Sequence, residues 1–318
     1  MSLPWVEKYR PKVLDDVIGN DDIVQNFKNI VDKGNIPHML LVGRPGVGKT
    51  TLALCLARTM LGEQMAEAFF EINASDDRGI ETVRKSITIF CQKKVSFPEG
   101  TKKQKIIFLD EFESMTITAQ QALRRIIEIY SKSTRFILAC NDSSSVTDAI
   151  QSRCSVHRFS KVKQKDIKAL LIKICKNEKI KYEMNAIKEI AIASNGDVRN
   201  SINCLQRVHN TYGDITFDNT TMIIDKPDHM IMTNLLKAII NKKFNEAKPI
   251  VDELINKGYY GLDIIRLLFH IVNDYKMDDD KMRLKFLSII GDVETNLLQS
   301  ADEYLQLLSL VSKMTLAV

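Results

Sequence analysis

The sequence of 318 residues lacks several patterns that mark specialised proteins. Its six cysteines include no C-x-x-C pair, its five histidines show no H-E-x-x-H spacing, and no apolar run approaches the length of a membrane span. The N-terminal residues lack the apolar core of a signal peptide. We therefore expect no disulfide framework, no protein-ligated metal site and no membrane partner, and we interpret the cysteines as buried free thiols in a reducing compartment.

Charge of one sign is in only mild excess. The formal net charge is +5, and the 45% hydrophobic and 27% charged residues are typical of globular proteins. Residues 1–225 hold 33 basic and 27 acidic side chains, so the whole excess lies in this part of the chain. A polyanionic partner is therefore permitted but not required. The chain is longer than a single hydrophobic core usually supports, so we expect two or three domains.

The clearest pattern in the chain is a phosphate-binding loop. Residues 43–50 fit the spacing G-x-x-x-x-G-K-[ST], between an apolar run, Met39–Val42, and a helix-forming stretch, Thr51–Ala57. Glycines let the backbone turn and bring its N–H groups to phosphate oxygens, while Lys49 adds a cation and Thr50 a hydroxyl for Mg²⁺. The loop consists of Gly43, Arg44, Pro45, Gly46, Val47, Gly48, Lys49 and Thr50.

Five apolar, β-rich runs alternate with amphipathic stretches up to residue 160. Such alternation predicts an α/β domain over residues 1–160, with a parallel sheet covered by helices on both faces. Ligands of such sheets bind at the carboxyl ends of the strands. The predicted strands are Met39–Val42, Phe69–Ile72, Ile106–Asp110, Arg135–Cys140 and Val156–Phe159, and the lysine-rich segment Lys93–Lys105 is interpreted as an exposed loop.

Beyond Ser160 the strand signal fades. Residues 161–225 are predicted to form a small helical domain with helices at Lys161–Leu171, Asn185–Ser194 and Arg199–Asn210. A boundary at residues 225–228 then precedes an all-helical domain over residues 226–318. Its predicted helices are Ile231–Asn241, Phe244–Lys257, Leu262–Tyr275, Asp280–Val293 and Ala301–Leu316.

Polar side chains follow two of the predicted strands. Asp110 and Glu111 end the third strand, where Asp110 can hold Mg²⁺ through water and Glu111 can polarise the water that attacks a γ-phosphate. Asn141 follows the fourth strand, where it can orient that water, read the γ-phosphate, or simply cap a turn.

Two arginines are candidates for contacts with a nucleotide. Arg153 can stabilise transition-state charge, either in its own subunit or in a neighbour, although surface arginines are common. Arg199 opens a predicted helix and can reach a nucleotide that lies between domains. Asp197 can cap the same helix, and capping alone would also explain this segment.

Together these motifs resemble those of the AAA+ ATPases, and more narrowly those of the small subunits of replication factor C, the sliding-clamp loader of eukaryotes and archaea. Residues 4–11 are similar to the N-terminal box of this family, and residues 73–79 and 119–125 to two further boxes. Ser152–Cys154 resembles its arginine-finger motif. The resemblance has specific motifs from residue 4 to about residue 210 and is less specific in the helical C-terminal region.

The resemblance implies a role for each matching residue, with ATP and Mg²⁺ as the cofactors. It assigns Val6 and Ile18 to the adenine and ribose pocket, counts Arg10 among the nucleotide-binding residues, and assigns residues 43–51, which include Thr51, to the phosphates. Asn141 becomes the first nucleotide sensor, and Arg199 becomes the second sensor within the same subunit. Arg153 becomes a finger inserted into the neighbouring subunit's site. Glu111 and Lys49 are the other catalytic residues. Thr50 and Asp110 are the residues that bind Mg²⁺, Asp110 through water.

The chain departs from the family at one motif. Small subunits usually have Asp-Glu-Ala-Asp at the end of the third strand, whereas this sequence has Asp110-Glu111-Phe112-Glu113. The two catalytic positions are intact. We therefore expect the change to affect local packing and the start of the next helix rather than the chemistry.

The resemblance also implies partners: the other subunits of a hetero-pentameric ring, the sliding clamp PCNA, and primer–template DNA, in the nucleus. The expected DNA contacts are Arg78, Arg84 and Lys85, on or just before a predicted helix at Gly79–Cys91, and Arg124, which with Arg125 begins the next helix. Solvated helix faces, or pairing with Glu81 and Glu128, are the alternative. Ile87, Ile89 and Phe90 either contact the clamp or belong to the core.

The predicted function is that of a clamp-loader ATPase subunit, in which ATP binding opens the clamp and hydrolysis on DNA releases it. A DNA-remodelling motor of the branch-migration type is an alternative, but it would need an appended DNA-binding module, and residues 226–318 show no basic stripe. A nucleotide-regulated scaffold that binds ATP without turnover is a second alternative, against which Glu111 argues.

Overall fold

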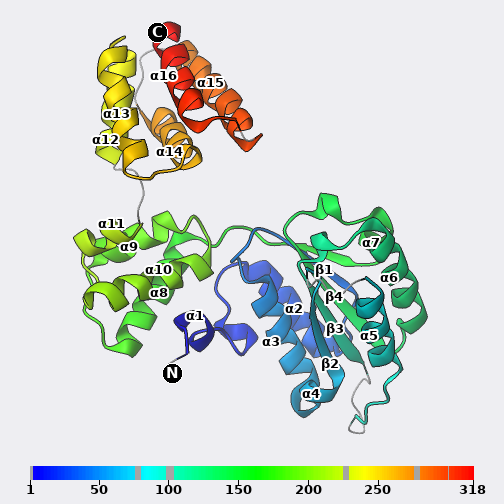
Figure 1. Ribbon diagram of the computed structural model, residues 1–318. Coiled ribbons are helices and arrows are strands. Elements are labelled where there is room, and N and C mark those ends of the chain that lie inside the picture. The colour runs from blue at the N-terminus through cyan, green and yellow to red at the C-terminus, as the bar shows by residue number, and fades with distance from the viewer. Residues whose placement is uncertain (1–2, 76–79, 98–103, 225–228, 276–279, 300) are drawn as a thin grey trace. The chain divides into compact units, whose positions relative to one another are not determined.

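The computed structural model describes residues 3–75, 80–97, 104–224, 229–275, 280–299 and 301–318 (Figure 1). The chain divides into two compact units, Met1–Ile224 and Asp225–Val318, which we describe separately. Among the described residues, no helix combines the length and the apolar character needed to cross a membrane.

The first unit is built on a parallel sheet of five strands in the order β2-β3-β4-β1-β5 (Figure 1). Each predicted strand is confirmed, with ends that agree to within one residue. The α/β prediction is therefore correct for this part of the chain. The strands are β1 (Met39–Val42), β2 (Phe69–Asn73), β3 (Lys105–Asp110), β4 (Thr134–Cys140) and β5 (Ser155–Arg158).

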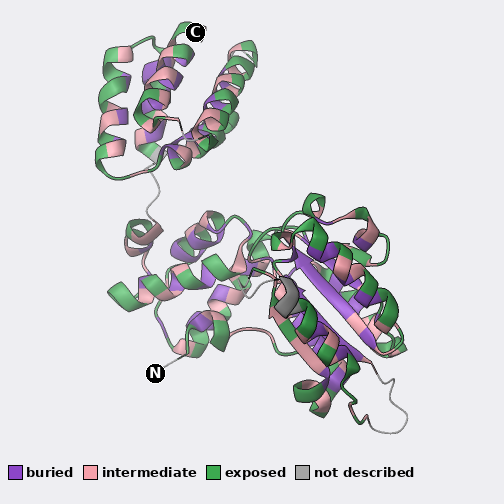
Figure 2. Ribbon diagram, turned by 45° about the vertical axis from the view of Figure 1, so that its right-hand side comes forward, coloured by how far each residue is buried: buried purple, intermediate pink, exposed green. Residues whose placement is uncertain are grey.

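Alternating side chains of the sheet serve two separate cores. In β1, Met39 and Leu41 pack with α2 and α3 on one face, whereas Leu40 and Val42 pack with α5 and α6 on the other. Because both faces are covered, the three central strands β1, β3 and β4 are largely apolar and buried between helices whose outer sides are exposed (Figure 2), whereas the edge strands β2 and β5 are only partly buried or exposed. The surrounding helices are α2 (Asp21–Lys33), α3 (Lys49–Leu61), α4 (Met65–Ala68), α5 (Ile80–Gln92), α6 (Ile117–Tyr130) and α7 (Asp148–Gln151).

Four helices complete the first unit: α8 (Gln164–Glu178), α9 (Met184–Ala193), α10 (Val198–Tyr212) and α11 (Phe217–Ile224). The first of them begins three residues later and ends seven residues later than predicted, and α11 was not predicted. Trp5, on the short N-terminal helix α1 (Trp5–Lys8), belongs to their apolar core. Its ring stacks on that of His209, with centroids 5.4 Å apart. The N-terminal segment is therefore anchored on the small helical region.

The second unit is all-helical, as predicted. Its core joins all five helices and includes Leu236, Val251, Leu268, Phe286 and Leu310, each at most 1% exposed. The predicted helices are confirmed, although α15 continues five residues beyond its predicted end. The helices are α12 (His229–Ile240), α13 (Phe244–Asn256), α14 (Gly261–Asp274), α15 (Asp280–Leu298) and α16 (Glu303–Ala317).

The predicted start of α6 is wrong. The helix begins at Ile117 because the Thr116 side chain caps it, accepting a hydrogen bond from the Ala119 backbone N–H at 3.3 Å. Arg124 and Arg125 therefore lie in the middle of α6 and not at its beginning.

Lys105 also differs from its prediction as the end of an exposed loop. It is the first residue of β3 and is only 5% exposed. Its ammonium group donates hydrogen bonds to the carbonyl oxygens of Phe90, Cys91 and Lys93, at and just after the end of α5. A buried cation thus satisfies carbonyl groups that a helix end leaves without partners.

Candidate nucleotide-binding site

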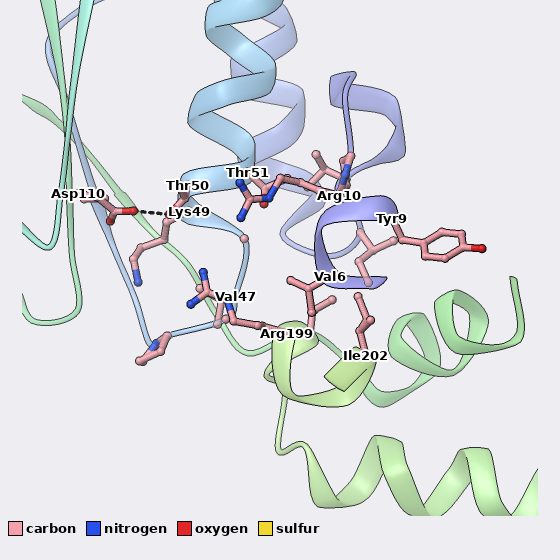
Figure 3. A pocket seen from close by; sticks show the side chains of 18 of the residues that line it. Val6, Tyr9, Arg10, Val47, Lys49, Thr50, Thr51, Asp110, Arg199 and Ile202 are labelled. Atoms are coloured by element: carbon pink, nitrogen blue, oxygen red, sulfur yellow. Dashed lines mark hydrogen bonds between the residues drawn. The ribbon is translucent and has the colours of Figure 1, made fainter. Parts of the chain in front are cut away.

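A cavity of about 420 Å³ lies at the carboxyl ends of the strands, beside the phosphate loop (Figure 3). Its volume is within the range of small-molecule sites. Of the predicted nucleotide and metal residues, the cavity is lined by Val6, Arg10, Ile18, Pro45, Gly46, Val47, Gly48, Lys49, Thr50, Thr51, Asp110, Glu111, Asn141 and Arg199. Gly43 and Arg44 are not among the lining residues, and they act through their carbonyl groups as described below.

The cavity combines an apolar wall with a charged one. Val6 and Ile202 face each other across its apolar part, where Ile18 and Leu170 also line it (Figure 3). The side chains of Lys49 and Arg199 extend into the part beside the phosphate loop (Figure 3). The first wall suits a flat base and the second a polyanion, which is the pairing that a nucleotide requires.

The N-terminal part of the apolar wall is fixed to the helices α8 and α10. The backbone N–H of Trp5 donates to the Gln206 side chain at 3.0 Å, and the Tyr9 hydroxyl donates to the Glu178 carboxylate at 2.5 Å. Burial, together with the bond to Glu178, raises the pKa of Tyr9 to about 12. The hydroxyl therefore remains a donor to Glu178 across the physiological range.

Lys49 is held at the centre of the phosphate loop. It is 8% exposed, and its ammonium group donates to the carbonyl oxygens of Gly43 and Arg44, the latter at 3.0 Å, and to Asn141 Oδ1 at 2.9 Å. Burial lowers its pKa, while the nearby carboxylates of Asp110 and Glu113 act in the opposite direction. These contacts hold a cation in place where the phosphates are expected.

Two neighbouring oxygen groups lie beside this cation. The Thr50 hydroxyl donates to Asp110 Oδ2 at 2.7 Å (Figure 3). Glu111 adopts a left-handed backbone conformation with φ of 52°, and its backbone N–H donates to Asp110 Oδ1 at 3.0 Å. A positive φ is uncommon outside glycine and often marks a functional turn. Among the described residues, no group of three or more His, Cys, Asp and Glu side chains is arranged to hold a metal ion.

The departure from the family motif lies inside this site. Phe112 is fully buried in the core that α5 and α6 form with the sheet, so its bulk is accommodated. Glu113 lines the cavity and accepts a hydrogen bond from Asn141 Nδ2 at 2.5 Å. We expected the change to affect local packing and the start of the next helix rather than the chemistry. Glu113 keeps the carboxylate of the family's aspartate, and this carboxylate lies in the site.

Arg199 reaches the cavity from the first turn of α10, while Asp197 caps the same helix. Asp197 Oδ1 accepts a hydrogen bond from the Asn200 backbone N–H at 2.8 Å. Capping by Asp197 and the position of Arg199 in the cavity lining are therefore compatible. The backbone N–H of Val198 donates to the carbonyl oxygen of Gly46 at 3.0 Å, so this helix is docked directly on the phosphate loop.

Replacing Gly46 with alanine is expected to weaken nucleotide binding by roughly 30- to 100-fold, from about 2–3 kcal/mol of backbone strain and lost capping. Gly46 has φ of 72°, and a Cβ there would lie 1.9 Å from Asp197 Oδ1. The matched control is Gly213→Ala, because Gly213 has φ of 81° but no atom within 4 Å of the added Cβ. Calorimetric titration with ADP measures the affinity of both variants. A Gly46→Ala variant with wild-type affinity for ADP would contradict the prediction.

Arg153 is absent from the lining of the cavity, and the topology explains why. It lies two residues before β5, whose first residue, Ser155, pairs with Met39 at the start of β1. The phosphate loop instead follows Val42, at the opposite end of β1, which is about 10 Å away at about 3.3 Å per residue. Arg153 Nη2 forms an ion pair with Glu128 of α6 at 2.7 Å. Arg153 is thus on the opposite edge of the sheet from its own chain's cavity.

The predicted DNA-contact residues differ in their exposure to solvent. Arg84 and Lys85 are exposed on α5, whereas Arg78 lies outside the described residues. Arg124 is partly buried, and its Nε lies 3.8 Å from Glu128, so part of the alternative pairing is present. Of the three α5 residues that were expected either to contact the clamp or to belong to the core, Ile87 is 1% and Ile89 68% exposed, and Phe90 stacks on Phe70.

Sequence reasoning missed several lining residues, among them Tyr9, Leu170, Ile202 and Glu113. A signal existed for three of them. Ile202 lies one helical turn after Arg199 and so shares its face, Tyr9 is next to Arg10, and Glu113 follows Glu111 by two residues. Leu170 lies far from the loop in sequence, and no spacing within the chain links it to the site.

Comparison with known proteins decides the family. Residues 39–162 match the "ATPase family associated with various cellular activities (AAA)", residues 169–208 the "RCF1/5-like, AAA+ ATPase lid domain", and residues 227–313 the "Replication factor C C-terminal domain". Replication factor C subunit 4 of Saccharomyces cerevisiae is 41% identical over 98% of this chain and 96% of its own length. The chain belongs to the replication factor C small-subunit family. It is therefore an AAA+ ATPase of DNA replication that works as part of a multi-subunit complex.

Other relatives agree with this assignment. A probable replication factor C subunit 2 of Dictyostelium discoideum is 41% identical over 99% of this chain and 92% of its own length. The replication factor C small subunit of Archaeoglobus fulgidus is 40% identical over 95% and 94%. The phosphate loop and the segment that begins at Asn73 predict a resemblance to the subunit numbered 4 in yeast and 2 in human, and relatives with both numbers are found.

The fold has a second kind of neighbour. The RuvB Holliday junction branch migration motor of Thermotoga maritima superposes with a TM-score of 0.56 over 73% of this chain and 79% of its own, at 21% identity. At that identity the likeness shows the shared AAA+ fold and not a shared activity. The predicted architecture, an AAA+ sheet domain followed by a lid and an all-helical C-terminal domain, is thus confirmed.

Proposed function

We propose that the chain binds ATP in the cavity beside the phosphate loop and, within a hetero-pentameric replication factor C ring, helps to open the clamp PCNA and load it at primer–template junctions. Its proposed location is the nucleus, where replication occurs in its eukaryotic relatives. The observation that carries the proposal is the position of Arg153, which cannot serve its own cavity but can complete that of a neighbour.

The groups beside Lys49 fit a hydrated magnesium ion. Mg²⁺ prefers oxygen ligands, keeps several waters and is usually held by one or two protein groups together with substrate phosphates. The Thr50 hydroxyl and the Asp110 carboxylate, 2.7 Å apart, supply such groups next to the loop. We propose that Thr50 binds the ion directly and Asp110 through water, and that the ion neutralises charge on the phosphates.

The remaining roles follow from position. Val6 and Ile18 would contact the base and ribose, and Arg10 would contribute from the same wall. Lys49 and Arg199 would contact phosphate oxygens as donors and cations. Glu111 would polarise the attacking water, which Asn141 would help to orient.

We also propose domain limits of 1–160 for the sheet domain, 161–225 for the small helical domain, or lid, and 226–318 for the C-terminal helical domain, or collar. The alternative of a branch-migration motor requires a DNA-binding module beyond the lid, whereas residues 227–313 match the replication factor C C-terminal domain. The remaining alternative is a scaffold that binds ATP without turnover. A measurement of single-turnover ATP hydrolysis by the assembled complex distinguishes this alternative from the proposed function.

Replacing Arg84 and Lys85 with alanine is expected to abolish most DNA-stimulated ATP turnover of the reconstituted complex, with nucleotide binding unchanged. Each side chain that contacts a phosphate contributes about one unit to the slope of log affinity against log salt, so the double variant should lose about two units. Adding Arg78→Ala should deepen the loss.

The matched control is the double variant Lys181→Ala/Lys188→Ala, which removes two exposed lysines from the lid region. It should keep the salt slope of the wild-type complex. The measurement is DNA stimulation with primed template and clamp, titrated from about 50 to about 200 mM salt. Full stimulation in the Arg84/Lys85 variant would remove α5 from the DNA contact surface.

A further inference from the structure

The side-chain amide of Asn141 is held from two sides. Its Oδ1 accepts a hydrogen bond from the Lys49 ammonium at 2.9 Å, and its Nδ2 donates to Glu113 Oε1 at 2.5 Å. An ammonium group can only donate and an ionised carboxylate can only accept. The two partners together therefore permit one orientation of the amide, and Glu113 fixes the end that carries the N–H groups.

Glu113 is itself set in place by its neighbour in the chain. Phe112 is fully buried among residues from α5, α6 and β4, and it anchors the short 3₁₀ turn η3 (Phe112–Ser114). The next side chain then extends into the cavity, which Glu113 lines. Phe112 thus anchors the turn from which the Glu113 side chain extends into the cavity.

The second oxygen of this carboxylate is unusual. Glu113 Oε2 is buried and has no hydrogen-bond partner among the described residues. A buried acceptor without a partner costs free energy, so stability does not explain why the carboxylate is there. A role in the adjacent site does, because its other oxygen holds the amide that faces the phosphate loop.

We propose that Glu113 is a positioning residue that orients Asn141 and thereby lets the site distinguish a nucleotide with a γ-phosphate from one without it. This inference rests on the proposed function, in which Asn141 faces the γ-phosphate. With one N–H held by Glu113, the amide keeps its second N–H for a phosphate oxygen or for the attacking water. Without Glu113 the amide can turn over and present Oδ1 to the phosphate, where two acceptors repel each other.

A purely electrostatic role predicts the opposite result. Removing a carboxylate beside the phosphates reduces repulsion, and it should strengthen the binding of a triphosphate more than that of a diphosphate. The proposal instead predicts that the preference for the triphosphate falls. The sign of the change therefore separates the two explanations.

The test measures the dissociation constants of ADP and of the slowly hydrolysed analogue ATPγS by calorimetry, for the isolated chain and for the assembled complex. Glu113→Ala is expected to reduce the ratio of the two affinities by about 10-fold. Glu113→Gln, which can still accept from Asn141 through its amide oxygen, should stay within about 3-fold of the wild-type ratio. Glu63→Ala, which removes an exposed carboxylate outside the cavity lining, should leave the ratio unchanged.

The outcomes separate the possible failures. An unchanged or raised preference in Glu113→Ala, with a normal melting temperature, overturns the positioning role alone. An equal loss in Glu113→Gln shows that accepting a hydrogen bond from Asn141 is not enough to keep the preference, and it also overturns the positioning role. A wild-type chain that binds both nucleotides equally overturns this inference together with the proposed role of Asn141. Wild-type preference without hydrolysis leaves this inference standing and removes only the catalytic part of the proposed function.

Discussion

Replacing Arg153 with alanine should lower ATP turnover at the neighbouring subunit's site by about 10³-fold or more, the range known for arginine fingers. The slow hydrolysis of the isolated chain should not change. The reason is the position of Arg153 beside the amino ends of the strands, whereas the cavity lies beside their carboxyl ends. Single-turnover hydrolysis, measured for the complex and for the chain alone, checks both halves of the prediction.

Two further variants make this test specific. Arg153→Lys keeps the charge but loses the planar donor fork, so it should restore only part of the rate. Arg58→Ala removes an exposed arginine of α3, outside the cavity lining, and should turn over as wild type. If the isolated chain and the complex lost activity equally in Arg153→Ala, the finger would act in its own site, against the topology.

Replacing Glu111 with glutamine should lower single-turnover hydrolysis in the complex by about 10²- to 10⁴-fold, the usual contribution of a general base. ATP affinity should remain within a few-fold of wild type. The Glu111 side chain lines the cavity and forms no hydrogen bond or ion pair with the described residues, so its carboxylate is available to a water. Because the change is isosteric, the left-handed backbone at this position should be kept.

The control for this variant is the binding of ADP, which should be unchanged. Retained hydrolysis in Glu111→Gln would show that another group activates the water. A wild-type complex that binds ATP at this site but does not hydrolyse it in a single turnover would instead support the scaffold alternative.

The sheet and its loop could be predicted because their signals are local. Met39–Val42 is a run of four buried residues, and a continuous apolar run is the pattern typical of a strand that is buried on both faces. The phosphate loop that follows it has a fixed spacing, and the cavity is indeed beside it. Asp110 and Asn141 could be placed at the same edge because carboxyl ends of parallel strands meet there.

What the sequence could not supply depends on contacts between distant residues. The hydrogen bond from Asn141 to Glu113 joins residues that are 28 positions apart, and neither residue type predicts this contact. Lys105 looks in the sequence like one more lysine of a basic loop, but three carbonyl groups at and just after the end of α5 accept hydrogen bonds from its ammonium group. Such partners become visible only when the strand and the helix lie side by side.

The start of α6 shows a different limit, because its signal is local but ambiguous. Thr116 and Thr118 are both residue types that cap helices, and they stand two positions apart. The hydrogen bond that Thr116 accepts from the Ala119 backbone N–H decides between them. Arg124, eight residues after this cap, consequently lies well inside the helix.

Val6 and Ile18 entered the prediction through the family resemblance and not through any pattern of their own. Each is an ordinary apolar residue more than 20 positions before the loop. The structure brings both to the cavity wall because both pack against the apolar core of the helices α8 to α10, to which Trp5 also belongs. Only the fold, therefore, explains why residues of the N-terminal segment line this cavity.

The separation of Arg153 from its own cavity gives the molecule a direction. One edge of the sheet would donate a finger and the opposite edge would receive one, so neighbouring chains must associate head to tail and not about a two-fold axis. In an open row of such subunits, the number of completed sites is one fewer than the number of chains. An end subunit then differs from its neighbours through its place in the row alone, even where its sequence is the same.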